Sequence, residues 1–391
     1  MKWEKKKLCE CTEYITDGDH QPAPKADKGV HFIKIKDIVN NQVSFDAQVY
    51  VPQEYYDNLP MERKPQKEDV LYTVVGSFGI PSYVQTDELF CFERNIALLH
   101  PNKDIEPRFL YYSLKNPAFY KGVEIVANGS AQKLIPLSKL KDLKISIPDK
   151  EAQRHIADIL SAYDDLIENN QKQIKLLEEA AQRLYKEWFV DLRFPGHENT
   201  KIVDGVPEGW NEKTLSQVAD VIMGQSPKSE FYNSEKKGLP FHQGVGSYGV
   251  RFVMDDIYST SYTRIAEPNS ILFSVRAPVG RLNITKNKVV IGRGLAAINQ
   301  TDGCQSYLYY LLKNKFFKDN IVGNGSIFAS VSKDELLNQK FLIPERNLMM
   351  QFEKIVSQMD KQIENLDSKN KKLIEARDRL LPKLMSGEVE V

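Results

Sequence analysis

Two long stretches of this chain place apolar residues at helical spacing. In residues 151–189 the apolar positions follow steps of four and three, and neither glycine nor proline interrupts them. Residues 348–381 repeat the pattern and stop at Pro382. Such a heptad pattern, sustained over about four and a half repeats, predicts a helix whose apolar stripe is covered by another helix. The predicted seam consists of Ile156, Leu160, Tyr163, Ile167, Asn170, Ile174, Leu177 and Leu184 in the first helix and Phe352, Val356, Met359, Ile363, Leu366, Asn370, Leu373 and Leu380 in the second.

The rest of the chain has a different pattern. Short β-branched and aromatic runs, such as residues 31–35 and 70–75, are broken by Gly, Pro and Asn, which predicts strands joined by loops. We therefore expect an α+β protein with two tandem α/β globules, each followed by a long helix. The predicted segments are a first globule at 1–150, a central helix at 151–191, a linker at 192–209, a second globule at 210–346, and a C-terminal helix with its tail at 347–391.

The second half of the chain repeats the first. A shift of 196 residues matches Ile167-Glu168-Asn169 to Ile363-Glu364-Asn365, and it also matches the Asn-Gly-Ser triplets at 128–130 and 324–326. The Leu-Tyr-Tyr element at 110–116 recurs at 308–314, whereas the loops between these anchors diverge. A duplicated scaffold with different loops indicates the same task on different targets, because loops carry recognition.

The two helices are expected to pair with each other in antiparallel orientation, because a globule lies between them in the chain. If the seams align at their centres, Asn170 faces Asn370, and such a polar layer fixes register at some cost in stability. Arg377 departs from the seam, which indicates either a neighbouring partner or a frayed end. At about 1.5 Å per residue, the helices would form a rod roughly 50–60 Å long with pseudo-twofold symmetry. A homodimeric coiled coil is the alternative, since a heptad pattern alone does not name its partner.

Composition narrows the class of protein. The formal net charge is zero, which argues against non-specific coating of nucleic acid but not against local recognition patches. Residues 151–189 hold eight acids and five bases, a net charge of −3, so the rest of the chain sums to +3. The four cysteines do not form a disulfide or zinc pattern, and no apolar run is long enough for a membrane span. We expect a reduced, cytoplasmic protein with no metal site and no membrane contact.

Catalytic motifs are weak. Residues 244–249 match GxGxxG, but the next residues read as a strand, whereas a dinucleotide site needs a helix there. Asn116-Pro117 is similar to a methyltransferase loop, but its second copy lacks the motif and no glycine-rich cofactor loop accompanies it. We find no Walker A, HExxH or GxSxG sequence. We therefore expect no catalytic residue and no cofactor in this chain.

The loops instead carry side chains suited to DNA. Arginine binds guanine edges and phosphates, and Gln, Ser, Lys and His also donate hydrogen bonds to DNA. The predicted DNA-binding residues are His20, Gln21, Lys34, Lys36 and Arg94 in the first globule, and Gln225, Ser226, Lys228, Gln243, Arg251, Arg276, Arg281 and Arg293 in the second. Taken singly, each is better explained as solvated surface, and only the two parallel sets of loops together indicate recognition of DNA.

The order of motifs resembles the specificity subunit of type I restriction-modification systems along essentially the whole chain. The motifs are Ile147-Pro148 leading into 151–157, Asp164 through Asn170, residues 184–191, Arg276-Ala277-Pro278-Val279-Gly280, both Asn-Gly-Ser triplets and the closing segment 380–388. The Glu-Gln expected after Pro344 is degraded, which puts the start of the second helix in doubt.

The resemblance implies two target-recognition domains that read the halves of a split, asymmetric double-stranded DNA sequence, with the helices setting the spacer. It also implies two modification subunits as partners, which bring S-adenosylmethionine, and restriction or motor subunits that use ATP and Mg. This chain would then be a non-catalytic specificity subunit. The alternatives are a fused or orphan methyltransferase or nuclease, which needs motifs absent here, and a coiled-coil scaffold without a DNA role.

Overall fold

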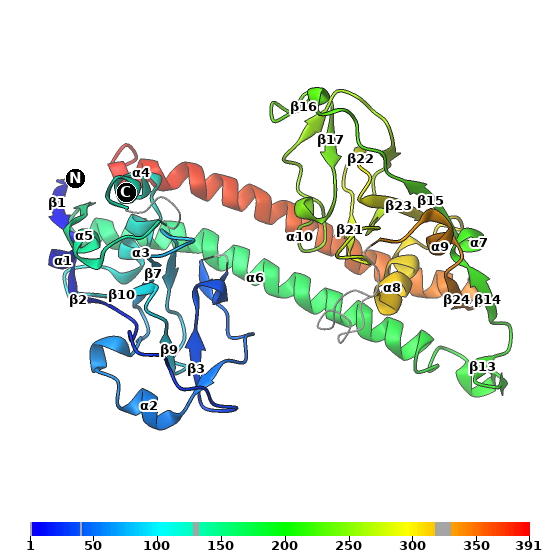
Figure 1. Cartoon of the computed structure of the whole chain (residues 1–391), viewed down its shortest axis with the longest axis horizontal. Helices are drawn as coiled ribbons and strands as arrows, with labels where there is room; N and C mark the ends of the chain where they lie inside the picture. Colours follow the sequence, from blue (N-terminus) through cyan, green and yellow to red (C-terminus); the bar gives the residue numbers. More distant parts are fainter. Residues whose placement is uncertain (1, 40, 128–132, 317–329) are drawn as a thin grey trace. The chain divides into compact units, whose positions relative to one another are not determined.

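The computed structural model describes residues 2–39, 41–127, 133–316 and 330–391 (Figure 1). Both Asn-Gly-Ser triplets lie outside these described residues. The chain forms two compact units, of which the first combines Met1–Gln171 with Ser368–Val391 and the second is Lys172–Asp367. Both long helices, α6 (Lys150–Phe189) and α10 (Arg346–Ser386), contribute to both units.

The two units contain similar series of elements. In the first unit these are β1 (Glu4–Lys7), α1 (Leu8–Cys11), β2 (Thr12–Asp17), β3 (Val30–Ile33), η1 (Ile35–Asp37), β4 (Ile38–Val39), β5 (Gln42–Val43), β6 (Tyr50–Val51), α2 (Gln53–Asp57), η2 (Met61–Arg63), β7 (Val70–Thr73), β8 (Pro81–Tyr83), β9 (Phe90–Phe92), β10 (Ile96–Pro101), α3 (Pro107–Lys115), α4 (Pro117–Val126), α5 (Leu137–Asp142) and β11 (Lys144–Ile147). In the second unit they are η3 (His197–Asn199), β12 (Ile202–Val203), β13 (Val206–Pro207), β14 (Asn211–Thr214), α7 (Leu215–Val218), β15 (Ala219–Met223), η4 (Ser229–Phe231), β16 (Tyr232–Asn233), β17 (Leu239–His242), η5 (Val245–Ser247), β18 (Tyr258–Ser259), β19 (Ile265–Ala266), β20 (Ile271–Ser274), β21 (Leu282–Ile284), β22 (Val289–Ile291), β23 (Leu295–Gln300), α8 (Gln305–Phe316), α9 (Lys333–Leu337) and β24 (Lys340–Ile343).

The four-stranded sheets of the two units have the same topology. An antiparallel four-stranded sheet runs β2-β10-β7-β8 in the first unit and β15-β23-β20-β21 in the second. Each unit also pairs its first strand with its last, β1 with β11 and β14 with β24. A parallel pair, β3 with β9 or β17 with β22, belongs to a second sheet, which has three strands in the first unit and five in the second. The predicted α+β fold and the predicted duplication are confirmed.

The first three residues of the central strands β7 and β20 are apolar because these strands separate two cores. In β7, Val70 and Tyr72 face one cluster while Leu71 faces another. In β20, Phe273 and Leu272 divide between two clusters in the same way. Successive strand side chains point to opposite faces, so burial on both faces requires an unbroken apolar run. Each fully buried side chain of this kind contributes about 1.5–3 kcal/mol.

Within each unit the segments of α6 and α10 pack antiparallel, as predicted. In the first unit the Asn170 side-chain amide donates a hydrogen bond of 2.7 Å to the Asn370 carbonyl oxygen, which confirms the predicted polar layer. In the second unit the Phe352 ring lies 6.0 Å from the rings of Tyr185 and Trp188. Every predicted seam residue is buried or half-buried.

The end of the second helix was predicted wrongly. We expected Pro382 to close it, but α10 continues through Pro382 to Ser386. Proline removes one backbone hydrogen bond from a helix interior and usually ends or kinks the helix. Here the last turn persists because Leu381, Leu384 and Met385 are buried in the core of the first unit. Among the described residues, no helix is both long and apolar enough to cross a membrane.

Candidate nucleic-acid interface

In the first unit, several loops meet at one edge of the sheets. They are the loop after β2 (18–22), the segment after β3 (34–36), the β7–β8 turn (74–80) and the segment before β10 (93–95). Backbone hydrogen bonds join them, because the Val74 N–H donates to the Asn95 carbonyl at 2.9 Å and the Glu93 N–H donates to the Ile33 carbonyl at 3.0 Å. We call this set of loops the loop edge of the first unit.

The second unit builds a corresponding loop edge from residues 224–228, 243–247, 275–281 and 292–294. Its backbone contacts are the same, since the Val275 N–H donates to the Gly294 carbonyl at 2.9 Å and the Gly292 N–H donates to the His242 carbonyl at 2.8 Å. The side chains also pack together here. The Ser226 hydroxyl donates to Gln243 Oε1 at 2.9 Å and accepts the Arg293 N–H at 3.2 Å.

Strand register aligns the two loop edges residue by residue. Ile96 pairs with Thr73 in the first unit, and Leu295 pairs with Ser274 in the second. Ile96 and Leu295 are therefore equivalent, and so are Arg94 and Arg293, which lie two residues before them.

The neighbouring strands extend this correspondence. Ile33 pairs with Phe92 and His242 pairs with Ile291, so Lys34 is equivalent to Gln243. The pairs of β2 with β10 and of β15 with β23 likewise make His20 equivalent to Ser226. Three DNA-binding residues predicted in the first globule thus occupy the same structural positions as three predicted in the second.

A glycine anchors the first loop of each edge. A Cβ at Gly18 would lie 2.2 Å from the Phe92 carbonyl oxygen, and a Cβ at Gly224 would lie 2.1 Å from the Gly292 carbonyl oxygen. Real Cβ atoms do not approach backbone oxygens this closely, so only glycine fits at these positions. The glycine lets the loop lie directly against the strand that leads to Arg94 or Arg293.

A cavity of about 400 Å³ opens at the loop edge of the first unit and is lined by Asp17, His20 and Arg94 above an apolar floor that includes Ile135. His20 lies 3.1 Å from Asp17 and is mostly exposed. Nearby, burial opposes ionisation of Asp19, but hydrogen bonds from the Gln21 N–H and the Tyr55 hydroxyl lower its pKa below the ordinary value.

The other predicted residues lie on or beside the same edges. Gln21, Lys36, Gln225, Lys228, Gln243 and Arg276 are exposed, while Lys34 and Arg281 are half-buried. The turn that carries Arg276 and Arg281 is held by Ser274, whose hydroxyl donates to the Pro278 carbonyl at 2.6 Å and accepts the Arg281 N–H at 2.8 Å. Thr73 holds the corresponding turn of the first unit in the same way.

Arg251 was predicted to bind DNA, and the structure contradicts this. Its side chain is buried, 2.5 Å from Asp360 and 3.5 Å from Glu178, and its guanidinium carbon lies 3.9 Å from the centre of the Tyr309 ring. Burial alone would lower the pKa of Arg251, but Tyr309, Tyr310 and the two carboxylates hold it above the ordinary value. The loop that carries Arg251 folds inward onto the long helices, so this side chain fastens the globule of the second unit to them.

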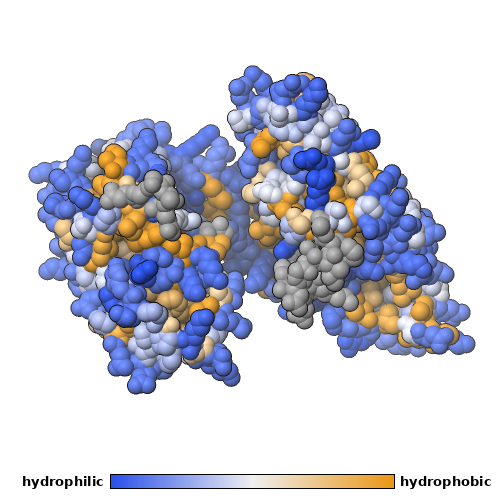
Figure 2. Space-filling model, in the orientation of Figure 1, coloured by the Kyte–Doolittle hydropathy of each residue, from blue (hydrophilic) through white to orange (hydrophobic). Residues whose placement is uncertain are grey.

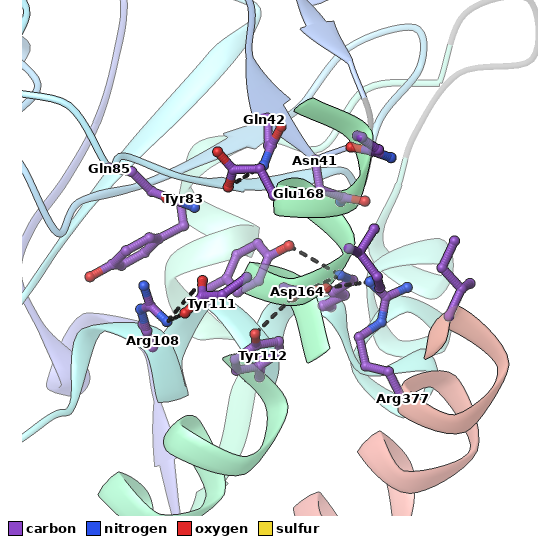
Figure 3. A pocket seen from close by; sticks show the side chains of 15 residues that line it. Asn41, Gln42, Tyr83, Gln85, Arg108, Tyr111, Tyr112, Asp164, Glu168 and Arg377 are labelled. Carbon is purple, nitrogen blue, oxygen red and sulfur yellow. Dashed lines mark hydrogen bonds and ion pairs between the residues drawn. The ribbon is translucent and has the colours of Figure 1, made fainter. Parts of the chain in front are cut away.

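Arg377, the departure from the seam, has a comparable role in the first unit (Figure 3). It forms a close ion pair with Asp164, which also accepts a 2.7 Å hydrogen bond from the Tyr112 hydroxyl. These residues and Arg108 line a cavity of about 210 Å³ beside α3, α6 and α10. Of the two explanations for Arg377, the structure supports a neighbouring partner.

The weak catalytic motifs have structural explanations. The GxGxxG stretch forms the short helix η5 and an isolated bridge between Tyr248 and Val253, so no helix of dinucleotide-binding type follows it. The Asn116 side chain caps α4 by accepting the Ala118 N–H at 3.0 Å. Of the cysteines, Cys9 is exposed and Cys11 is buried, and burial raises the pKa of Cys11 to about 12.

The sequence interpretation missed the acidic partners at the loop edge of the first unit. Asp19 pairs with Arg63 at 3.3 Å, and Glu93 accepts the Ile35 N–H at 2.7 Å. Apolar side chains are also exposed at the surface, which is mainly hydrophilic with scattered apolar patches in the view of Figure 2. Among them is Leu134, which lines the cavity beside Arg94. Aligning the two halves by strand register would have shown that these residues lie at the loop edge.

Comparison with known proteins agrees with this geometry. The family model described as "Type I restriction modification DNA specificity domain" matches residues 1–179 and 207–376. The chain is 30% identical to the type I restriction enzyme MjaX specificity subunit of Methanocaldococcus jannaschii, over 100% of this chain and 94% of that protein. It is 25% identical to the HindI specificity subunit of Haemophilus influenzae, over 92% of this chain and 94% of that protein. The S subunit structure from M. genitalium matches with a TM-score of 0.61 at 19% identity, covering 98% of this chain and 96% of that chain, which shows a shared fold.

Proposed function

Because this chain belongs to the family of type I restriction-modification DNA specificity subunits, we propose that each of its two units reads one half of a split, asymmetric DNA target. Members of this family are non-catalytic and work in complexes with other subunits and DNA. The observation that carries the proposal is the pair of equivalent loop edges with different side chains, His20 against Ser226 and Lys34 against Gln243. Equal scaffolds with unequal polar groups suit the recognition of two unequal sequences.

The partners in this proposal are double-stranded DNA, two modification subunits and the restriction or motor subunits. The modification subunits would supply S-adenosylmethionine, and ATP and Mg would belong to the motor and nuclease subunits. The duplicated architecture supports two copies of one modification subunit, because two similar surfaces can bind two identical partners. The paired α6 and α10 would set the length of the unread spacer, with the Asn170–Asn370 layer fixing their register.

Methylation mapping tests the proposal. The chain would be co-expressed with its modification subunit in a host that lacks adenine methylation, and the genome would be sequenced for methyladenine. We expect a motif with two short defined halves and a fixed spacer. Replacing residues 1–150 by the corresponding segment of another specificity subunit should change one half only. A stable complex that leaves no motif would contradict the proposal.

A further inference from the structure

The three equivalent positions of the loop edges differ in how far the two units have diverged. His20 corresponds to Ser226 and Lys34 corresponds to Gln243, so these two pairs differ in size, charge and hydrogen-bonding groups. The third position is arginine in both units, at Arg94 and Arg293. The retained position therefore contrasts with two changed positions on the same backbone frame.

Both arginine side chains point into solvent rather than into contacts within the protein. Arg94 and Arg293 are exposed, and within the described residues neither guanidinium has a hydrogen bond or an ion pair. Their backbones, in contrast, are tightly held. The residue after each accepts a 2.9 Å hydrogen bond from the turn that follows β7 or β20, and Gly18 or Gly224 packs against the residues just before it.

A side chain that reads a base must change when the base changes, whereas a phosphate contact need not, because every nucleotide carries the same phosphate. From this contrast we infer that Arg94 and Arg293 bind DNA backbone phosphates, one in each half of the target. The changed pairs, His20 with Ser226 and Lys34 with Gln243, then contact the bases. This assignment rests on the proposed function and deepens it, since it separates the residues that position DNA from those that read it.

The test uses the full chain in complex with its modification subunit and two duplexes of equal length, one with the mapped target and one without it. Arg94→Ala should weaken binding to both duplexes by the same factor, roughly ten- to hundredfold for a charge-assisted hydrogen bond. The slope of log affinity against log salt should fall by about 0.9, the value for one phosphate contact. Arg94→Lys should restore most of the affinity, because a phosphate accepts a point charge.

The double variant His20→Ser, Lys34→Gln is the matched control on the same loop edge. It should lose more affinity for the target duplex than for the other duplex, to which only the lost Lys34 charge matters, and should alter the methylated motif in one half, while Arg94→Ala leaves the motif unchanged. A loss confined to the target duplex, a relaxed base in the motif or a failure of Arg94→Lys to restore binding would show that Arg94 reads a base. No effect of Arg94→Ala on either duplex would equally overturn the assignment.

These outcomes are distinct from a failure of the proposed function itself. In that case the wild-type complex would leave no methylated motif, so that no target duplex could be defined. Arg94 and His20 are exposed and Lys34 is half-buried, so the thermal unfolding temperature of each variant is measured first and should stay close to that of the wild type.

Discussion

Replacing Arg251 by alanine should destabilise the second unit strongly. The side chain is 3% exposed and contacts Asp360, Glu178, the Tyr310 hydroxyl at 3.2 Å and the Tyr309 ring. Alanine would remove the cation and leave two carboxylates and a phenol around an empty space. The substitution therefore tests whether this arginine holds the globule against its helices or is instead available to bind DNA.

The structure sets the magnitude. Removing one partner of a buried ion pair costs about 3–5 kcal/mol. The Asp360 and Glu178 side chains keep 22% and 18% exposure, so water can partly solvate them and the lower end, about 3 kcal/mol, applies. Loss of the cation–π contact with Tyr309 adds about 1 kcal/mol. We expect the free energy of unfolding of the second unit to fall by about 4 kcal/mol.

Tryptophan fluorescence can measure this unit separately. The chain has three tryptophans, and Trp188 and Trp210 both lie in the core of the second unit. In a Trp3→Phe background, emission during urea unfolding therefore reports that unit. Arg183→Ala is the matched control, because Arg183 is 82% exposed and its loss should change the stability by less than about 0.5 kcal/mol.

The result that would refute this reasoning is a change of less than about 1 kcal/mol for Arg251→Ala, comparable with an exposed site. It would mean that the carboxylates around Arg251 are solvated in the folded protein and that the side chain is available to DNA. A large loss of DNA affinity at unchanged stability would lead to the same conclusion.

Four further substitutions test the contacts described above. Asn170→Leu should cost about 1–3 kcal/mol, because the side-chain carbonyl oxygen of Asn370 loses its donor, and replacing both by leucine should recover most of this loss in thermal unfolding. Gly18→Ala and Gly224→Ala should weaken DNA binding in gel-shift assays while circular dichroism stays near wild type, since a Cβ forces the loop away from its strand; a wild-type gel shift would contradict this. Arg377→Ala should lower the thermal stability of the first unit, whereas no shift in differential scanning fluorimetry would mean that its ion pair is not structural.

The long-range order of the chain could be predicted from the sequence because its signals are periodic. The heptad steps identified both helices and their facing asparagines, and the paired amides at Asn170 and Asn370 confirm the register. The end at Pro382 was wrong because tertiary packing of Leu384 and Met385 outweighs the local cost of proline. The helix propensity of the residues around Pro382 does not include these tertiary contacts.

Only part of the candidate site could be predicted, because the direction of a side chain also depends on tertiary structure. Arginines can be found in a sequence, but their direction depends on whether a loop turns outward or inward. Arg293 faces solvent while Arg251 is buried, and the residue type alone does not distinguish them. A signal for the outward position does exist, since Arg94-Asn95-Ile96-Ala97 and Arg293-Gly294-Leu295-Ala296 share an Arg-x-apolar-Ala pattern. Its meaning becomes clear only when the strand pairs align the two halves.

The composition of the first unit has a consequence for synthesis on the ribosome. This unit needs residues 368–391, whose Leu381, Leu384 and Met385 fill its core beside Leu8 and Leu160, whereas the second unit is one continuous stretch. The first unit, most of which is translated before the second, is therefore the last that can finish folding. Until the final turn of α10 leaves the ribosome, the nascent chain carries an open apolar core at its N-terminal end. A chain that terminates just after Asp367 would retain the sequence of the complete second unit but would lack the C-terminal segment that completes the core of the first unit.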